Sequence, residues 1–102
     1  MSLKAAFLFL SPEGNASIHR SEVSTDSVSV TTCAVNDYRA ACELAKKLVN
    51  DEGIVAIELC GGFGTEGVAE VKRAVDGKAA VGVVRFDAHP GLQYQSGDSL
   101  FK

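Results

Sequence analysis

The chain has 102 residues, of which 46% are hydrophobic and 23% charged, and its formal net charge is −3. This length fits one small domain, and the composition is ordinary for a soluble globular protein. The absence of a basic patch argues against nucleic-acid binding. The longest apolar runs, residues 5–10 and 79–84, are too short to cross a bilayer, so we expect no membrane partner.

The first third of the chain predicts two strands. Residues 4–10 are apolar throughout, which is typical of a central strand, and Ser11-Pro-Glu-Gly14 breaks it. Residues 15–23 leave two alternatives open, a short helix or an irregular loop. Residues 27–35 alternate polar and apolar side chains over their first half, which predicts a half-exposed strand at an edge of the sheet.

A helix follows, capped by Asn36 or Asp37 and continuing to about Asn50 before Gly53 ends it. Its apolar positions fall on one stripe: Tyr38, Ala41, Ala45, Leu48 and Val49. Residues 54–59 then form a short run rich in β-branched side chains. That pattern predicts a strand buried on both faces, as in a parallel sheet.

The stretch at residues 58–67, Glu-Leu-Cys-Gly-Gly-Phe-Gly-Thr-Glu-Gly, joins this strand to a second helix. We expect Thr65 to be the N-cap of that helix and Asp76-Gly77 to end it. A last strand occupies residues 79–86. The glycines permit positive φ and let the backbone approach a ligand without obstruction by side chains.

These elements predict an α/β fold, a small βα-repeat domain with a mainly parallel four-stranded sheet and helices packed on it. If residues 15–23 form a crossover helix, the flavodoxin-like strand order 2-1-3-4 is favoured. The alternative is that the first two strands pair as an antiparallel ribbon. Residues 1–102 make a single domain with a core at 4–87. The tail at 88–102 is expected to pack on the sheet or, as we favour, on a partner subunit in a homo-oligomer.

The three cysteines, Cys33, Cys42 and Cys60, are odd in number and widely spaced. This spacing argues against a disulfide framework or a zinc site and favours a reducing, cytoplasmic setting. Cys33 and Cys42 are expected to act as small buried apolar residues.

The glycine-rich turn is the candidate binding site, because strands of a parallel sheet present ligands at their carboxyl ends and a helix N-terminus attracts anions. Residues 62–67 match G-x-G-x-x-G, but Phe63 is bulky, Glu66 would repel phosphates, and one such unit is too short for a dinucleotide. We therefore expect a small anionic ligand, held by residues of the turn and of the last strand: Glu58, Gly61, Gly62, Gly64, Thr65, Arg85 and Asp87.

Two residues are candidates for catalysis. Cys60 would be a thiol activated by the helix N-terminus and Arg85, and His89 would transfer a proton. A simpler interpretation pairs Glu58 with Arg85 across adjacent strands. A metal site of Glu58, Asp87 and His89 is a weaker hypothesis, because no compact ligand motif supports it.

The segments Glu58-Leu-Cys-Gly-Gly-Phe-Gly64, Val81-Gly-Val-Val-Arg-Phe-Asp87 and His89-Pro-Gly91 occur together in this order. The combination resembles a family of small single-domain prokaryotic proteins that is catalogued as a domain of unknown function. The resemblance covers residues 4–91 and implies a cytoplasmic α/β protein. It assigns no catalytic residue and no cofactor.

The sequence thus predicts a protein that either binds or both binds and acts on a small anionic metabolite at the glycine-rich turn. The alternative is a non-enzymatic oligomeric module in which the turn is only a tight connection. Neither the reaction nor a cofactor follows from these residues.

Overall fold

The computed structural model describes residues 2–102. The strands are β1 (Leu3–Leu10), β2 (Arg20–Ser24), β3 (Val28–Val35), β4 (Ala56–Leu59) and β5 (Ala80–Val83). The helices are α1 (Tyr38–Glu52), α2 (Thr65–Val75) and the short α3 (Gly97–Leu100), with a 3-10 turn η1 (Pro90–Leu92). Within residues 2–102 no helix is both long and apolar enough to cross a membrane.

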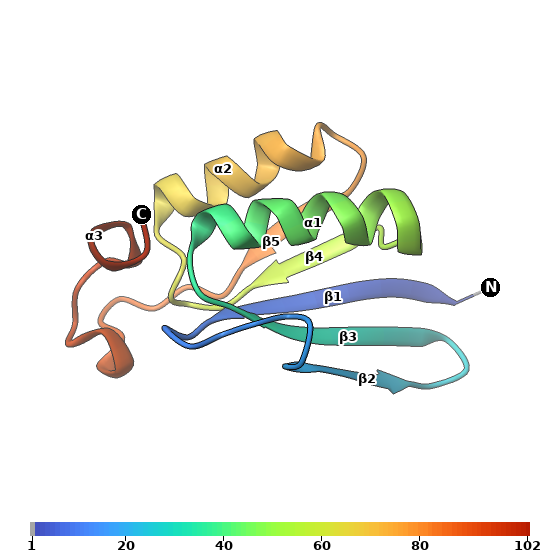
Figure 1. The fold of residues 1–102 in the computed structure, drawn as a ribbon, viewed down its shortest axis with the longest axis horizontal. Coiled ribbons are helices and arrows are strands. Elements are labelled where there is room, and N and C mark those ends of the chain that lie inside the picture. Colours follow the sequence, from blue (N-terminus) through green and yellow to red (C-terminus); the bar gives the residue numbers. More distant parts are fainter. Residues whose placement is uncertain (1) are drawn as a thin grey trace.

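The strands form one mixed sheet in the order β2-β3-β1-β4-β5 (Figure 1). β1 pairs in parallel with β3 and with β4, and β4 pairs in parallel with β5. The predicted α/β fold with a mainly parallel sheet is confirmed, and the four predicted strands lie in the favoured order. The predicted number of strands is wrong, because β2 adds a fifth, antiparallel strand beside β3.

The segment between β1 and β3 contains no helix. Residues 15–19 form a turn, and Arg20–Ser24 becomes the edge strand, every residue of which is exposed. With a single apolar side chain, Val23, this strand has no hydrophobic pattern, and its pairing with β3 comes from the backbone. β3 is therefore an inner strand, contrary to the edge position predicted for it, and its last three residues are buried.

Gly14 allows the segment to return over the end of β3. Its amide donates to the Ser11 carbonyl oxygen, and the Ser11 amide donates to the Val35 carbonyl oxygen. A Cβ atom at position 14 would lie 2.7 Å from the Val35 carbonyl carbon, so a larger residue would push the turn off the sheet.

Both long helices cover the same face of the sheet. The connections β3-α1-β4 and β4-α2-β5 move across the sheet in the same direction, and right-handed crossovers then place both helices on one side. α1 and α2 lie next to each other along the sheet (Figure 1). Because the segment from β1 to β3 has no crossover helix, no helix of residues 2–102 covers the other face.

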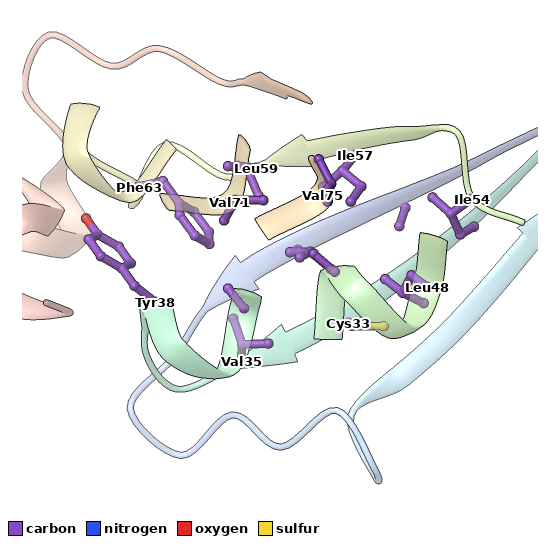
Figure 2. Packing of buried hydrophobic residues seen from close by; sticks show 14 residues of the cluster. Cys33, Val35, Tyr38, Leu48, Ile54, Ile57, Leu59, Phe63, Val71 and Val75 are labelled. Carbon is purple, nitrogen blue, oxygen red and sulfur yellow. The ribbon is translucent and has the colours of Figure 1, made fainter. Parts of the chain in front are cut away.

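The core lies between the sheet and these helices (Figure 2). Leu8 and Leu59 from the sheet and Leu48 from α1 are fully buried there. The rings of Tyr38 and Phe63 stack with centroids 5.5 Å apart at the end of the core near the glycine-rich turn. The predicted apolar stripe of α1 is confirmed at four positions, namely Tyr38, Ala41, Ala45 and Leu48, while Val49 is half-buried.

The ends of the helices follow the expected chemistry in three places. The Asp37 side chain accepts a hydrogen bond from the Ala40 amide at 2.8 Å, as an N-cap does. Gly53, at φ 71°, and Asp76, at φ 50°, end α1 and α2 in the left-handed conformation. α1 continues to Glu52, two residues beyond the predicted end.

Candidate functional site

A cleft of about 420 Å³ opens at the carboxyl ends of β4 and β5, beside the first turn of α2. The glycine-rich turn forms one wall, the segment after β5 forms a second, and the chain that leads into α3 forms a third. The lining residues are Gly61, Phe63, Gly64, Thr65, Val68, Val83, Val84, Arg85, Phe86, Asp87, His89, Tyr94, Gln95, Ser96 and Gly97.

The N-terminus of α2 holds a carboxylate from the same chain. Gly64 occupies the N-cap position and has no side chain to cap the helix, so Thr65 is the first helical residue and its predicted capping role is wrong. Instead, Asp98 Oδ2 accepts from the Glu66 amide at 3.2 Å and Asp98 Oδ1 accepts from the Gly67 amide at 3.1 Å. The carboxylate thus occupies the position where the sequence predicts that an anion binds.

Tyr38, the first residue of α1, completes this arrangement. Its hydroxyl donates to Asp98 Oδ1 at 2.7 Å and accepts from the Gly64 amide at 3.0 Å. Burial, and then the hydrogen bond to Asp98, raise the pKa of Tyr38 far above its usual range. The hydroxyl therefore stays protonated and can donate at any physiological pH.

The pKa of Asp98 reflects opposing effects. Partial burial raises it, but the hydrogen bonds from the Tyr38 hydroxyl and from the Glu66 and Gly67 amides outweigh burial, and the pKa of Asp98 is lowered. The carboxylate is therefore ionised at neutral pH, where it complements the positive end of the α2 dipole.

The C-terminal segment makes two further contacts with its own domain. The Phe101 carbonyl oxygen accepts from the Tyr38 amide at 3.1 Å, at the N-terminus of α1, and the Phe101 side chain packs against the core. Gly97 is buried, and a Cβ atom there would overlap the Gly62 carbonyl oxygen. The tail thus packs on the N-termini of its own helices and, through Phe101, on the core.

The glycines of the turn give space and do not supply unusual backbone geometry. Gly53 and Gly77 have positive φ, but Gly61, Gly62 and Gly64 do not, so the turn does not use the positive φ that glycine permits. A Cβ atom at Gly61 would overlap the Phe86 ring, and one at Gly64 would overlap the Asp98 carboxyl group. Only glycine fits at positions 61 and 64, because side chains of the C-terminal third lie directly against them.

The cleft collects most of the predicted ligand-binding residues, together with His89. The predicted site residues that line the cleft are Gly61, Gly64, Thr65, Arg85, Asp87 and His89. Gly62 lies instead against Gly97, and Glu58 is exposed on β4. Cys60 lies outside the cleft, where its Sγ atom accepts from the Leu10 amide at 3.4 Å and from the Gly62 amide at 3.3 Å.

Arg85 pairs with Asp87 and not with Glu58. Arg85 Nη2 lies 2.9 Å from Asp87 Oδ1, and both side chains are more than four-fifths exposed. The predicted pairing of Glu58 with Arg85 is wrong, because β5 ends at Val83 and Glu58 lies opposite Gly82 in the ladder. Arg85 therefore extends beyond the sheet into the cleft region.

His89 is held by the chain next to it. Its Nδ1 atom accepts from the Gly91 amide at 3.0 Å, and its ring lies 4.3 Å from that of Phe86. Nε2 carries the proton in the neutral tautomer that this hydrogen bond selects. Within residues 2–102 no hydrogen bond joins His89 to Cys60, and no three His, Cys, Asp or Glu side chains gather to hold a metal ion. Glu58, Asp87 and His89 therefore do not form the hypothesised metal site.

A protein-family model described as a family of unknown function (DUF6506) matches residues 3–99. The chain belongs to this family. The family suggested by the motifs is thereby confirmed, and the match extends past Gly91 to include Asp98. No curated protein and no solved structure matches the chain.

We expect the substitution Asp98→Ala to lower the free energy of unfolding by about 1–2 kcal/mol at pH 7, since it removes the cap of α2. The pKa of the carboxyl group is lower in the folded protein than its value of about 3.9 in an unfolded chain. The contribution of this carboxyl group to the free energy of unfolding is therefore complete well above pH 3.9. It is lost as the pH falls through the folded pKa. Denaturant titrations from pH 7 to pH 3 measure this, with Ser99→Ala as the control. A difference from wild type that stays constant over this range would contradict the assignment.

We expect Gly64→Ala to displace α3, because the added methyl group overlaps the Asp98 carboxyl group. The matched control is Gly82→Ala, where a Cβ atom meets nothing within 4 Å. Overpacking costs about 1–3 kcal/mol, so exchange of the Phe101 and Tyr38 amide hydrogens should accelerate roughly tenfold or more in Gly64→Ala alone. Equal protection in both variants would show that the tail does not depend on Gly64.

Proposed function

We propose that the protein binds a small organic anion in the cleft beside the glycine-rich turn. The observation that supports this most is the position of Arg85, a cation at the carboxyl edge of the sheet on the border of an open cleft. Ligands of α/β sheets bind at this edge, and the cleft volume is within the range of small-molecule sites.

Arg85 is the group that would bind the anion. A guanidinium offers two parallel donors that match a carboxylate or phosphate group. Its pairing with Asp87 is highly exposed, and such pairs contribute only ~0–1 kcal/mol. A ligand oxyanion can therefore replace Asp87 at small cost.

The other walls of the cleft suit the body of such a ligand. Phe86 and Tyr94 are 50% and 69% exposed, so both rings have surface to cover, and Val68 adds an aliphatic wall. The His89 Nε2–H group and the Thr65 hydroxyl would supply hydrogen bonds. The preferred ligand is then a small acid with a flat or apolar body.

This proposal moves the anion site away from the α2 amides. Those amides already bind Asp98, so an external anion would have to displace the C-terminal segment to reach them. It also favours binding over catalysis, since Cys60 lies outside the cleft lining and its thiol contacts backbone amides. The three free cysteines support a cytoplasmic location for this activity.

A second candidate function is that of a non-enzymatic oligomeric module. One observation favours it: the sheet face opposite α1 and α2 carries no helix of the described chain.

Two substitutions with opposite effects test ligand binding. Arg85→Gln should abolish the thermal stabilisation produced by the best hit from a panel of carboxylates and phosphates. Asp87→Asn removes the competing carboxylate and should tighten binding by up to about fivefold, since the exposed pair is worth at most ~1 kcal/mol.

Isothermal titration calorimetry of the wild-type protein and both variants gives the affinities. Lys78→Gln removes one positive charge from an exposed position between α2 and β5 and serves as the control for net charge. Equal affinities in wild type, Arg85→Gln and Asp87→Asn would reject Arg85 as the anion-binding group. A panel in which no acid binds would contradict the proposed function itself.

A further inference from the structure

The sheet face opposite the helices is apolar and uncovered. Side chains alternate along a strand, so the residues of β1 that do not face the core point to this side, as do their partners on β3 and β2. Ala5 and Ala34 are buried yet lie outside the core cluster, which fits a separate patch of packed side chains on this face. The largest apolar side chains of the face are Leu3, Phe7, Phe9, Val23, Val28 and Val30.

The outer parts of this face are exposed, while Phe7 and Phe9 nearer its centre are half-buried. Leu3 is 47% exposed and Val23 is 71% exposed. A Cβ atom at Gly82, on β5, would meet no atom within 4 Å. Parallel strands normally have both faces covered, so an apolar face of this kind calls for a partner.

We propose that a second copy of this chain covers the face, giving a two-fold symmetric dimer in which the two sheets pack against each other. The proposal is independent of ligand binding in the cleft, which lies on the helix side of the sheet. It rests on the area of the face and on its pattern of charge.

The area is sufficient for a dimer. Five strands spaced about 4.8 Å apart, with up to eight residues each, give a flat footprint on the order of 400–500 Å². Two such faces together bury roughly 1,000 Å² of surface, and the projecting side chains add to this flat area. The total reaches the range of specific interfaces.

The polar groups of the face are complementary under two-fold symmetry. The ladder pairings place Ser21, Thr32, Phe7, Glu58 and Gly82 in one row across the sheet, with Phe7 on the central strand. A two-fold axis along β1 brings Phe7 against its own copy and Glu58 against Thr32 of the second copy. It also brings the small residue Ser21 against Gly82.

This arrangement gives a hydrogen-bond donor to Glu58, the one charged side chain in the row. Glu58 is exposed in the single chain, and within residues 2–102 it forms no ion pair. In the dimer the hydroxyl group of Thr32 donates to the Glu58 carboxylate, twice by symmetry. A partner without hydroxyl donors at this position would leave a carboxylate buried and unsatisfied, which disfavours a lipid surface or an apolar helix.

Native mass spectrometry and light scattering of the full chain test the proposal. The wild-type protein should have twice the chain mass of 10.7 kDa. Gly82→Arg and Val23→Arg place a cation on opposite edges of the face at positions where the single chain has room, and both should give monomers. Asn50→Arg adds the same charge on α1, on the helix side, and should remain dimeric.

The register has its own test. Thr32→Val removes the donor to Glu58 and should weaken dimerisation at least about tenfold, as for a buried charge that loses its partner. Circular dichroism of each variant checks that the fold is kept. A monomeric wild type, or a dimer that survives both Gly82→Arg and Val23→Arg, would overturn the proposal, and an unchanged dimer in Thr32→Val would overturn the alignment along β1.

Discussion

One carboxylate, that of Asp98, determines how the carboxyl edge of this sheet is built. It accepts hydrogen bonds from two amides at the N-terminus of α2 and from the Tyr38 hydroxyl at the start of α1. A helix of eleven residues with a glycine at its N-cap position would otherwise leave these donors without a side-chain cap. Through Asp98, the four-residue helix α3 contacts both α1 and α2, and the chain leading into it forms a wall of the cleft.

The glycine-rich turn follows from this contact. Asp98 requires the small Gly64 beside it, and Phe86 requires Gly61. The Gly62 carbonyl oxygen in turn leaves no space for a side chain at Gly97. A turn with larger residues would force the C-terminal third away from the helices, and the cleft would lose its walls. The same residues that resemble a ligand-binding loop in sequence are thus required first by packing within the chain, and any ligand site lies next to them.

The sequence predicted the fold where hydrophobic patterns are strong, and it failed where structure comes from the backbone or from distant residues. The apolar runs identified the parallel strands and their order, and the spacing of Tyr38, Ala41, Ala45 and Leu48 identified α1. β2 was missed because its five residues include one apolar side chain and its stability comes from pairing with β3. Asp98 was missed because 31 residues separate it from the Gly67 amide, and no local pattern marks such a contact. One face of the sheet has no helix over it because the chain between β1 and β3 forms the edge strand β2 and not a crossover helix.

The central claim is that an ionised Asp98 binds the N-terminus of α2. A carbon-13 NMR titration of the Asp98 carboxyl group in the folded protein tests it most directly. We predict that the pKa of Asp98 lies below 3.8, its ordinary value, and that it rises in Tyr38→Phe, which removes one donor. A pKa at or above 3.8 in the wild-type protein would contradict the claim, because it would show that the amides of α2 and the Tyr38 hydroxyl do not stabilise the carboxylate.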